Sequence, residues 1–355
     1  MSLRELFEHL SFLLHLSVST VEVFLSSTPT APPVFGQFLV HRVFSYVPLQ
    51  GLDEIQIRIM NELASPRSFR WDIRESYASI AERLRVDEET VRRRVKRARE
   101  SGFLKGWKLF LNPHLIGLES TGMQLDIDDE ERKAAVISQV ERMDGVVILI
   151  DFHSRALRII LYYESESDLE RKTQQIKSIC GNDQLLLWKG GFPASDQNMK
   201  RTDWEIVKAF RKDPRRSPSK VADEVGVSTR TIKRRLTAMT QNNSIFMLPA
   251  LNYDKSLGVA CDFLIICPDE TKRSEVNKQM RAKLDRVVFS FTEAKGFSIF
   301  ALMCLNLSES EEIHKWIKGM DGVSDVRVDI MRGNILVDKW LDEEIEKQLS
   351  EHSVG

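Results

Sequence analysis

The spacing of apolar residues predicts three short helices between residues 203 and 241. In the third helix Ile232, Leu236 and Met239 fall at i, i+4 and i+7, which places them on one face. Gly226 precedes this helix and can supply the positive φ of a tight turn, and Ser228 is a suitable N-cap. A helix, a tight turn and a capped helix in this order predict a helix-turn-helix.

The same pattern occurs earlier in the chain. Thr90–Arg94 matches Thr231–Arg235 at a separation of 141 residues. Asp53 and Asp203 are 150 residues apart, so the first copy needs nine extra residues, which we expect in or near Ser65–Ser76. The chain is therefore predicted to contain two copies of one cassette.

A strand follows each helix-turn-helix, and a longer α/β pattern comes after it. Phe103–Phe110 and Ile245–Leu251 have strand composition and predict the wing of a winged helix. Beyond the wings, strands are predicted over 123–127, 146–152, 157–163 and 184–188, and again over 261–267, 287–291, 297–305 and 326–331. Helices between them give the order β-α-β-β-α-β, which predicts a ferredoxin-like sheet with two helices on one face. The other face would need a partner, either inside the chain or in a second copy.

The predicted fold class is α+β, with two winged helix-turn-helix domains, each followed by a ferredoxin-like domain. The predicted boundaries are 1–50 for a poorly specified extension, 51–118 and 119–195 for the first cassette, 196–258 and 259–333 for the second, and 334–355 for a C-terminal helix. The apolar stretch Leu10–Leu25 contains His15 and Glu22 and is too short for a membrane span. We therefore expect neither a signal peptide nor membrane association.

Composition and charge reduce the number of function classes that fit the sequence. The chain has 355 residues, 42% of them hydrophobic, and its formal charge of −1 conceals an alternation of blocks. Residues 51–118 carry 14 basic and 10 acidic groups and residues 201–258 carry 12 and 6, whereas the ferredoxin-like segments are net acidic. Basic helix-turn-helix segments between acidic segments are the pattern expected when only some parts contact nucleic acid. The four cysteines form no CxxC and stand among apolar residues, which favours buried thiols in the cytoplasm.

The two helix-turn-helix copies differ in ways that bear on mechanism. Arg85 stands where the second copy has Gly226, so the first turn either takes a negative φ or holds a left-handed non-glycine residue at a cost of about 1 kcal/mol. The first recognition helix also opens with Asp87, Glu88 and Glu89, which would repel phosphates. We expect the first copy to contribute mostly affinity for the DNA backbone, and the second copy to contribute more of the recognition of bases.

The chain resembles the leucine-responsive/asparagine-regulator (Lrp/AsnC) family of transcription regulators. The resemblance covers residues 52–335 and rests on the two helix-turn-helix units, the Leu111-Asn112-Pro113 and Leu251-Asn252-Tyr253 segments after the wings, and the β-α-β-β-α-β units. Because family members usually carry one cassette, this chain resembles a tandem fusion. The resemblance implies a regulator that binds double-stranded DNA as a pseudo-dimer or homo-oligomer, on paired half-sites.

The candidate DNA-binding residues lie on the two predicted recognition helices and the first wing. They are Thr90, Arg92, Arg93, Arg94, Lys96, Arg97, Lys105 and Lys108 in the first copy, and Ser228, Thr229, Arg230, Thr231, Lys233 and Arg234 in the second. In the family a small effector binds near the loop between the second and third strands, which here would place it at Lys295, Gly296 and Ser298. Neither copy has the typical Gly followed by an acidic residue in this loop, so a plain structural hairpin is favoured.

Two alternatives remain from other classes of function. Siroheme decarboxylases have a similar cassette and also occur fused in pairs, which keeps an enzyme open, with His114 and His153 as isolated candidates. A scaffold whose helix-turn-helix units bind protein is the third interpretation. Because no metal-ligand spacing, phosphate loop or nucleophile elbow occurs, we expect no enzyme activity, no cofactor and no metal.

Overall fold

The computed structural model describes residues 54–64, 76–181, 185–195, 197–255, 258–284, 286–292 and 294–352. The predicted extension at 1–50 and nearly all of the predicted insertion at 65–76 lie outside these ranges. No helix in the described ranges is both long enough and apolar enough to cross a membrane.

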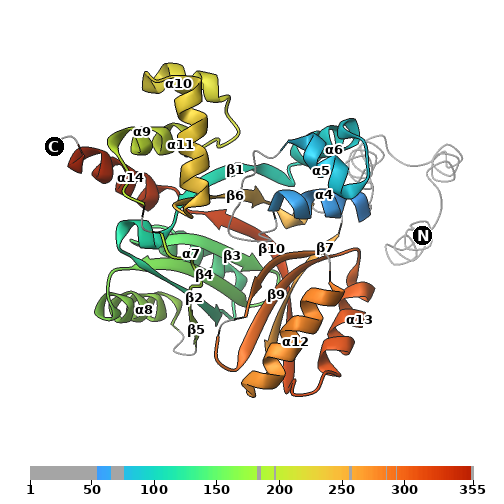
Figure 1. The fold of residues 1–355 in the computed structure, drawn as a ribbon. Helices are drawn as coiled ribbons and strands as arrows, with labels where there is room; N and C mark the ends of the chain where they lie inside the picture. The colour runs from blue at the N-terminus through green and yellow to red at the C-terminus, as the bar shows by residue number, and fades with distance from the viewer. Residues whose placement is uncertain are drawn as a thin grey trace, which may run out of the picture. The chain divides into compact units, whose positions relative to one another are not determined.

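The first cassette has the predicted order of elements (Figure 1). Its helix-turn-helix consists of α4 (Glu54–Ala64), α5 (Tyr77–Leu84) and α6 (Glu88–Glu100), followed by β1 (Leu104–Leu111) and a 3-10 turn over Pro113–Ile116. The ferredoxin-like unit then runs through β2 (Glu119–Asp126), α7 (Glu130–Val140), β3 (Val146–Phe152), β4 (Ala156–Tyr163), α8 (Glu166–Cys180) and β5 (Leu185–Lys189).

The second cassette follows the same order. Its helices α9 (Arg201–Phe210), α10 (Pro218–Val225) and α11 (Thr229–Gln241) precede β6 (Ile245–Leu251) and a 3-10 turn over Tyr253–Lys255. The sheet elements are β7 (Val259–Ile266), α12 (Glu270–Lys283), β8 (Val287–Phe291), β9 (Phe297–Cys304), α13 (Leu307–Lys318) and β10 (Asp325–Leu336), and α14 (Lys339–Glu351) follows. The predicted inward faces are confirmed: Val91 and Val95 of α6 and Ile232, Leu236 and Met239 of α11 are buried.

The two predicted wings form one ribbon that joins the cassettes. β1 and β6 pair antiparallel from Leu104↔Leu251 to Leu111↔Ile245, in a separate two-stranded sheet. Phe110 stacks on Phe246 across the ribbon at 5.6 Å between ring centroids. The expectation of a wing within each helix-turn-helix was therefore wrong, because each strand is apolar enough to be buried against the strand of the other cassette.

The two ferredoxin-like units form a single eight-stranded sheet in the order β5-β2-β4-β3-β10-β7-β9-β8. β10 joins them, because its first half pairs with β7 and its second half pairs with β3. Its register shifts between Met331 and Gly333, where the strand passes from one unit to the other. The predicted strand at 326–331 was too short: residues 334–336, assigned to the C-terminal helix, pair with β3, and the helix begins at Lys339.

The helix-free faces of the two units pack against each other. Trp188 of β5 contacts Phe291 and Phe297 of the second unit, with ring centroids 5.8 and 5.9 Å apart. Helices α7 and α8 cover the opposite face of the first unit, and α12 and α13 that of the second. Both sheet faces that were predicted to need a partner are thus buried within the chain.

The four cysteines are free thiols and buried, as predicted.

Candidate nucleic-acid interface

The second recognition helix, α11, is fixed at its start by a serine cap. The Ser228 hydroxyl accepts a hydrogen bond from the Thr231 N–H at 3.1 Å, and Gly226 closes the preceding turn at φ 75°. Both predictions for this turn are confirmed. The cap satisfies one of the amides that an α-helix leaves without an intrahelical partner, so the first turn of α11 is well defined.

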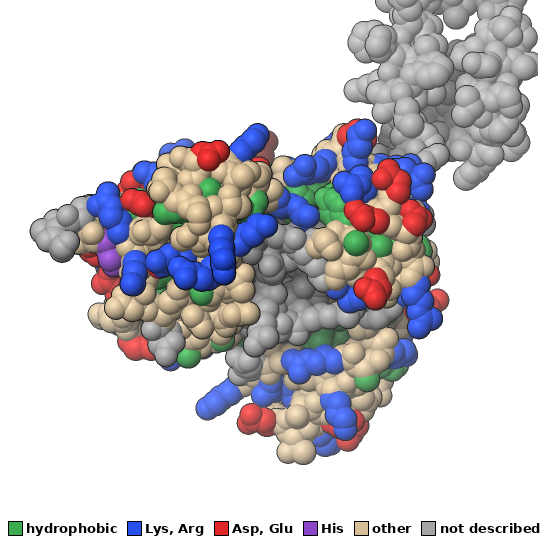
Figure 2. Space-filling view, turned by 45° about the horizontal axis from the view of Figure 1, so that its top comes forward, with side chains coloured by type: hydrophobic (Ala, Val, Ile, Leu, Met, Phe, Trp, Pro, Cys, Tyr) green, Lys and Arg blue, Asp and Glu red, His purple; other side chains and the backbone are tan. Residues whose placement is uncertain are grey.

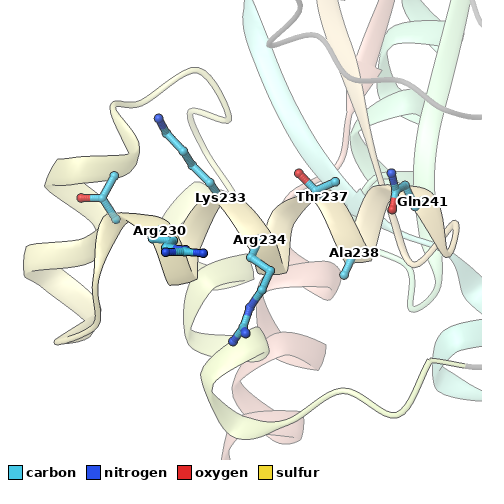
Figure 3. A pocket seen from close by; sticks show the side chains of 7 residues that line it. Arg230, Lys233, Arg234, Thr237, Ala238 and Gln241 are labelled. Carbon is cyan, nitrogen blue, oxygen red and sulfur yellow. The ribbon is translucent and has the colours of Figure 1, made fainter.

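The outward face of α11 carries three cationic side chains. Figure 3 shows the side chains that project from this helix, among them Arg230, Lys233 and Arg234. These three cations are exposed. No carboxylate in the described ranges lies within ion-pair distance of any of them. Their charge is therefore available to a ligand.

Two further residues of this surface were not among the sequence candidates. Thr237 and Gln241 line the same shallow surface as Arg230, Lys233 and Arg234, together with Thr229 and Ala238. Both are exposed. The available signal was their spacing, since they follow Lys233 at i+4 and i+8 on the same helix face.

A buried ion pair holds α11 from its inner side. The Arg235 guanidinium donates to both carboxylate oxygens of Asp203 on α9, at 2.8 and 2.9 Å, and Asp203 is 2% exposed. Asp203 also accepts a hydrogen bond from the Lys200 N–H at 2.9 Å, at the start of α9. One carboxylate therefore fixes both the start of the first helix and the rotation of the recognition helix. Alignment of the two cassettes matched Asp203 with Asp53, but the sequence did not indicate that Asp203 pairs with Arg235.

The first recognition helix, α6, begins with a charged cap. Asp87 accepts from the Thr90 N–H and the Thr90 hydroxyl, both at 2.7 Å. These hydrogen bonds lower the pKa of the Asp87 carboxyl below its ordinary value. The turn before it contains Arg85 at φ 56°, so the left-handed alternative is the observed one.

Several candidate cations of α6 are engaged within the helix or its surroundings. Arg92 pairs with Glu88 at 2.5 Å, and Lys96 lies 3.7 Å from Glu100. Arg94 is half-buried, at the position that corresponds to Arg235 in the second copy. Arg93 and Arg97 are exposed. Within the described parts of the chain, these two have no ion pair. The net cationic surface of α6 is thus smaller than that of α11.

Figure 2 shows the same difference. Lys and Arg side chains gather over the second helix-turn-helix unit, whereas acidic and basic side chains are mixed over the first.

The two lysines of the predicted first wing have different environments. Lys105 is exposed. Lys108 donates to the Leu336 carbonyl oxygen at 3.3 Å and forms an ion pair with Asp338 at the start of α14. The structure therefore places Lys108 at the junction with the C-terminal helix, where its charge is paired.

The effector candidates occupy the β8–β9 hairpin. Lys295 is exposed and Gly296 takes φ 82° in the turn, while Ser298 is fully buried in β9. The side chains of Lys295 and Ser298 therefore differ in their access to solvent.

The two histidines considered for catalysis lie apart from this hairpin. His114 Nδ1 is 3.1 Å from the Pro193 carbonyl oxygen, and exposed His153 lies 2.9 Å from Asp254. Each has a local partner. His153 and Asp254 also lie near the ion pair between Arg332 and Glu130.

Comparisons with known proteins agree with the geometry of the second unit. An AsnC-type helix-turn-helix domain matches residues 199–240. A helix-turn-helix-type transcriptional regulator of Pyrococcus abyssi is 29% identical over 132 residues, which is 37% of this chain and 85% of that protein. Another from Pyrococcus horikoshii is 26% identical over 90 residues, or 25% and 56% of the two chains.

A solved structure shares the two-cassette fold. The siroheme decarboxylase NirDL superposes with a TM-score of 0.50 at 14% identity, covering 84% of this chain and 99% of that one. At this identity the likeness concerns the fold alone. The chain therefore contains an AsnC-type helix-turn-helix domain, is similar to regulators of the Lrp/AsnC family over part of its length, and has a two-cassette fold like that of NirDL.

Proposed function

We propose that the protein is a sequence-specific, double-stranded DNA-binding transcription regulator that acts in the cytoplasm and reads paired half-sites. The observation that carries the proposal is the outward face of α11, where Arg230, Lys233 and Arg234 are exposed and no carboxylate of the described chain neutralises them. The relatives named as transcriptional regulators support it.

The chemistry of α11 suits a major groove. An Arg guanidinium can donate two hydrogen bonds to the O6 and N7 atoms of guanine, and a Thr methyl can contact the methyl of thymine. The candidates for base contacts are Arg230, Arg234 and Thr229 near the start of the helix, and Lys233 would neutralise a phosphate. Arg93 and Arg97 of α6 would bind phosphates of the second half-site.

The test is binding of the full chain to labelled duplex from the upstream region of its own gene, titrated across salt. An unrelated duplex of equal length is the control. We expect log K to fall steeply with log salt, and the upstream duplex to bind at least about tenfold more tightly. If neither duplex binds at low salt, DNA is not the partner of the protein.

A second candidate function follows from the fold shared with NirDL, which is a siroheme decarboxylase. In this alternative the chain would bind a tetrapyrrole and act on its carboxylates. Titration of the full chain with an iron tetrapyrrole, followed by absorbance, separates the two functions. A saturable spectral shift without DNA binding would support the enzyme.

A further inference from the structure

A contact outside the recognition helices joins the two helix-turn-helix units. The loop between α9 and α10 in the second cassette carries Arg215, whose guanidinium carbon lies 5.0 Å from the ring centroid of Tyr77 and 5.1 Å from that of Trp107. Tyr77 is the first residue of α5, and Trp107 lies in β1. One cation of the second cassette thus contacts two aromatic rings of the first.

The same two rings contact cations of the first recognition helix. Arg92 of α6 lies 5.7 Å from the Tyr77 centroid, and Arg99 of α6 lies 5.0 Å from that of Trp107. Guanidinium groups at these distances are attracted by the ring quadrupole. Tyr77 and Trp107 therefore connect α6 to the loop that carries Arg215.

The loop has a second attachment four residues earlier. The Leu109 N–H donates to the Arg211 carbonyl oxygen at 3.0 Å, and the Arg211 guanidinium donates to the Leu109 carbonyl oxygen at 2.9 Å. Arg211 is 2% exposed, and Asp338, just before α14, and Asp342, within it, lie 2.9 and 3.1 Å from it. The loop is therefore attached to β1 at one end and stacked on Tyr77 and Trp107 at the other.

The recognition helices are also close in sequence to the shared ribbon. Residues 101–103 alone separate α6 from β1, and residues 242–244 alone separate α11 from β6. Because β1 and β6 pair with each other, the ribbon restricts the relative position of the two helices. The Arg215 contact adds a restraint on the same pair, through Trp107 of the ribbon and Tyr77 of α5.

We propose that Arg215, packed on Tyr77 and Trp107, fixes the separation of the two recognition helices and so determines which half-site spacing the protein accepts. This inference rests on the proposed DNA-binding function. A rigid pair of helices fits half-sites on one face of the duplex, where positions recur about every 10.5 base pairs. Insertion of about half a turn moves one half-site to the opposite face.

The first experiment locates the bound site by footprinting on the upstream duplex. It then measures affinity for that site and for versions with 5 or 10 base pairs inserted between the half-sites. The proteins are the full chain, Arg215→Ala and Tyr77→Leu. Arg171→Ala is the matched control, since it removes an exposed guanidinium from α8. For the unaltered chain we expect at least a tenfold loss with 5 inserted base pairs. For Arg215→Ala and Tyr77→Leu we expect the loss to shrink to threefold or less.

A second experiment needs no DNA. Spin labels at Lys96→Cys on α6 and Gln241→Cys on α11 report the distance between the helices, and the four native cysteines are buried. We expect one narrow distance distribution in the otherwise unaltered chain and a broader one after Arg215→Ala, with the unfolding midpoint showing that both proteins are folded.

The two experiments separate the possible failures. A uniform loss of affinity across all spacings after Arg215→Ala would overturn the inference, because it would make Arg215 an ordinary phosphate contact. An unchanged distance distribution would overturn it as well. If the unaltered chain binds no duplex, the proposed function fails, and a broadened distribution would still establish that Arg215 restrains the two helices.

Discussion

Arg158 on β4 and Asp262 on β7 form a bidentate ion pair between the two ferredoxin-like units, at 2.6 and 2.8 Å. Neither residue has any exposed surface. Gln124 accepts two further hydrogen bonds from the Arg158 guanidinium, at 2.6 and 3.1 Å. The pair therefore sits fully desolvated in the interface between the two helix-free sheet faces, where a lost partner cannot be replaced by water.

Removal of one member of this pair should destabilise the protein strongly. Arg158→Met leaves the Asp262 carboxylate buried without a counter-charge, and we expect a loss of about 3–5 kcal/mol in the free energy of unfolding. The double variant with Asp262→Leu should recover most of that loss. Urea denaturation of both variants measures this, and a single-variant loss below about 1 kcal/mol would contradict it.

The turn before α6 should be improved by glycine. Arg85 holds φ 56°, where a side chain is strained, so Arg85→Gly should stabilise the protein by about 0.5–1 kcal/mol. The reverse change in the second copy, Gly226→Arg, places a side chain at φ 75° and should cost about 1 kcal/mol. Thermal unfolding of the two variants checks the opposite signs, and shifts of equal sign would refute the argument.

The charged cap of α6 should make the first helix-turn-helix sensitive to acid. Hydrogen bonds to Thr90 lower the pKa of Asp87, so its contribution to stability is present above the ordinary carboxylate pKa and is lost as pH falls through the lowered value. The cap of α11 is Ser228, which does not titrate in this range. Amide exchange between pH 7 and 3, corrected for intrinsic rates, should show α6 losing protection before α11.

The matched control for this prediction is Asp87→Ser, which gives α6 the cap type of α11. In that variant the pH dependence of α6 protection should diminish. A pH profile for α6 that is the same in both proteins would exclude the cap as its cause.

The two recognition helices should contribute unequally to DNA binding. Arg234 is exposed on α11, and we expect Arg234→Ala to cost about 1–3 kcal/mol in specific binding. Arg93→Ala should cost less and should lower affinity for specific and unrelated duplex alike, with a salt slope reduced by about 1. Equal losses of binding in the two variants would contradict the unequal contribution of the two helices, but not the proposal that the protein binds DNA.

Local sequence determined the helices, their caps and the order of the elements. The apolar spacing in α6 and α11, Ser228 as a cap and Gly226 in the turn depend on interactions within a few residues, so they can be predicted without knowledge of the fold. The contrast between the acidic start of α6 and the cationic face of α11 could also be predicted from the local sequence. These features define the candidate interface.

The tertiary structure decided which distant segments pair. Strand composition cannot specify a partner, so only the fold showed that β1 and β6 form one ribbon and that β10 continues to Leu336 along β3. The same long-range pairing placed Lys108 beside Asp338 and Arg215 against Tyr77 and Trp107. Side-chain partners more than 100 residues apart depend on this packing, which explains why Lys108 looked like part of a basic wing in the sequence.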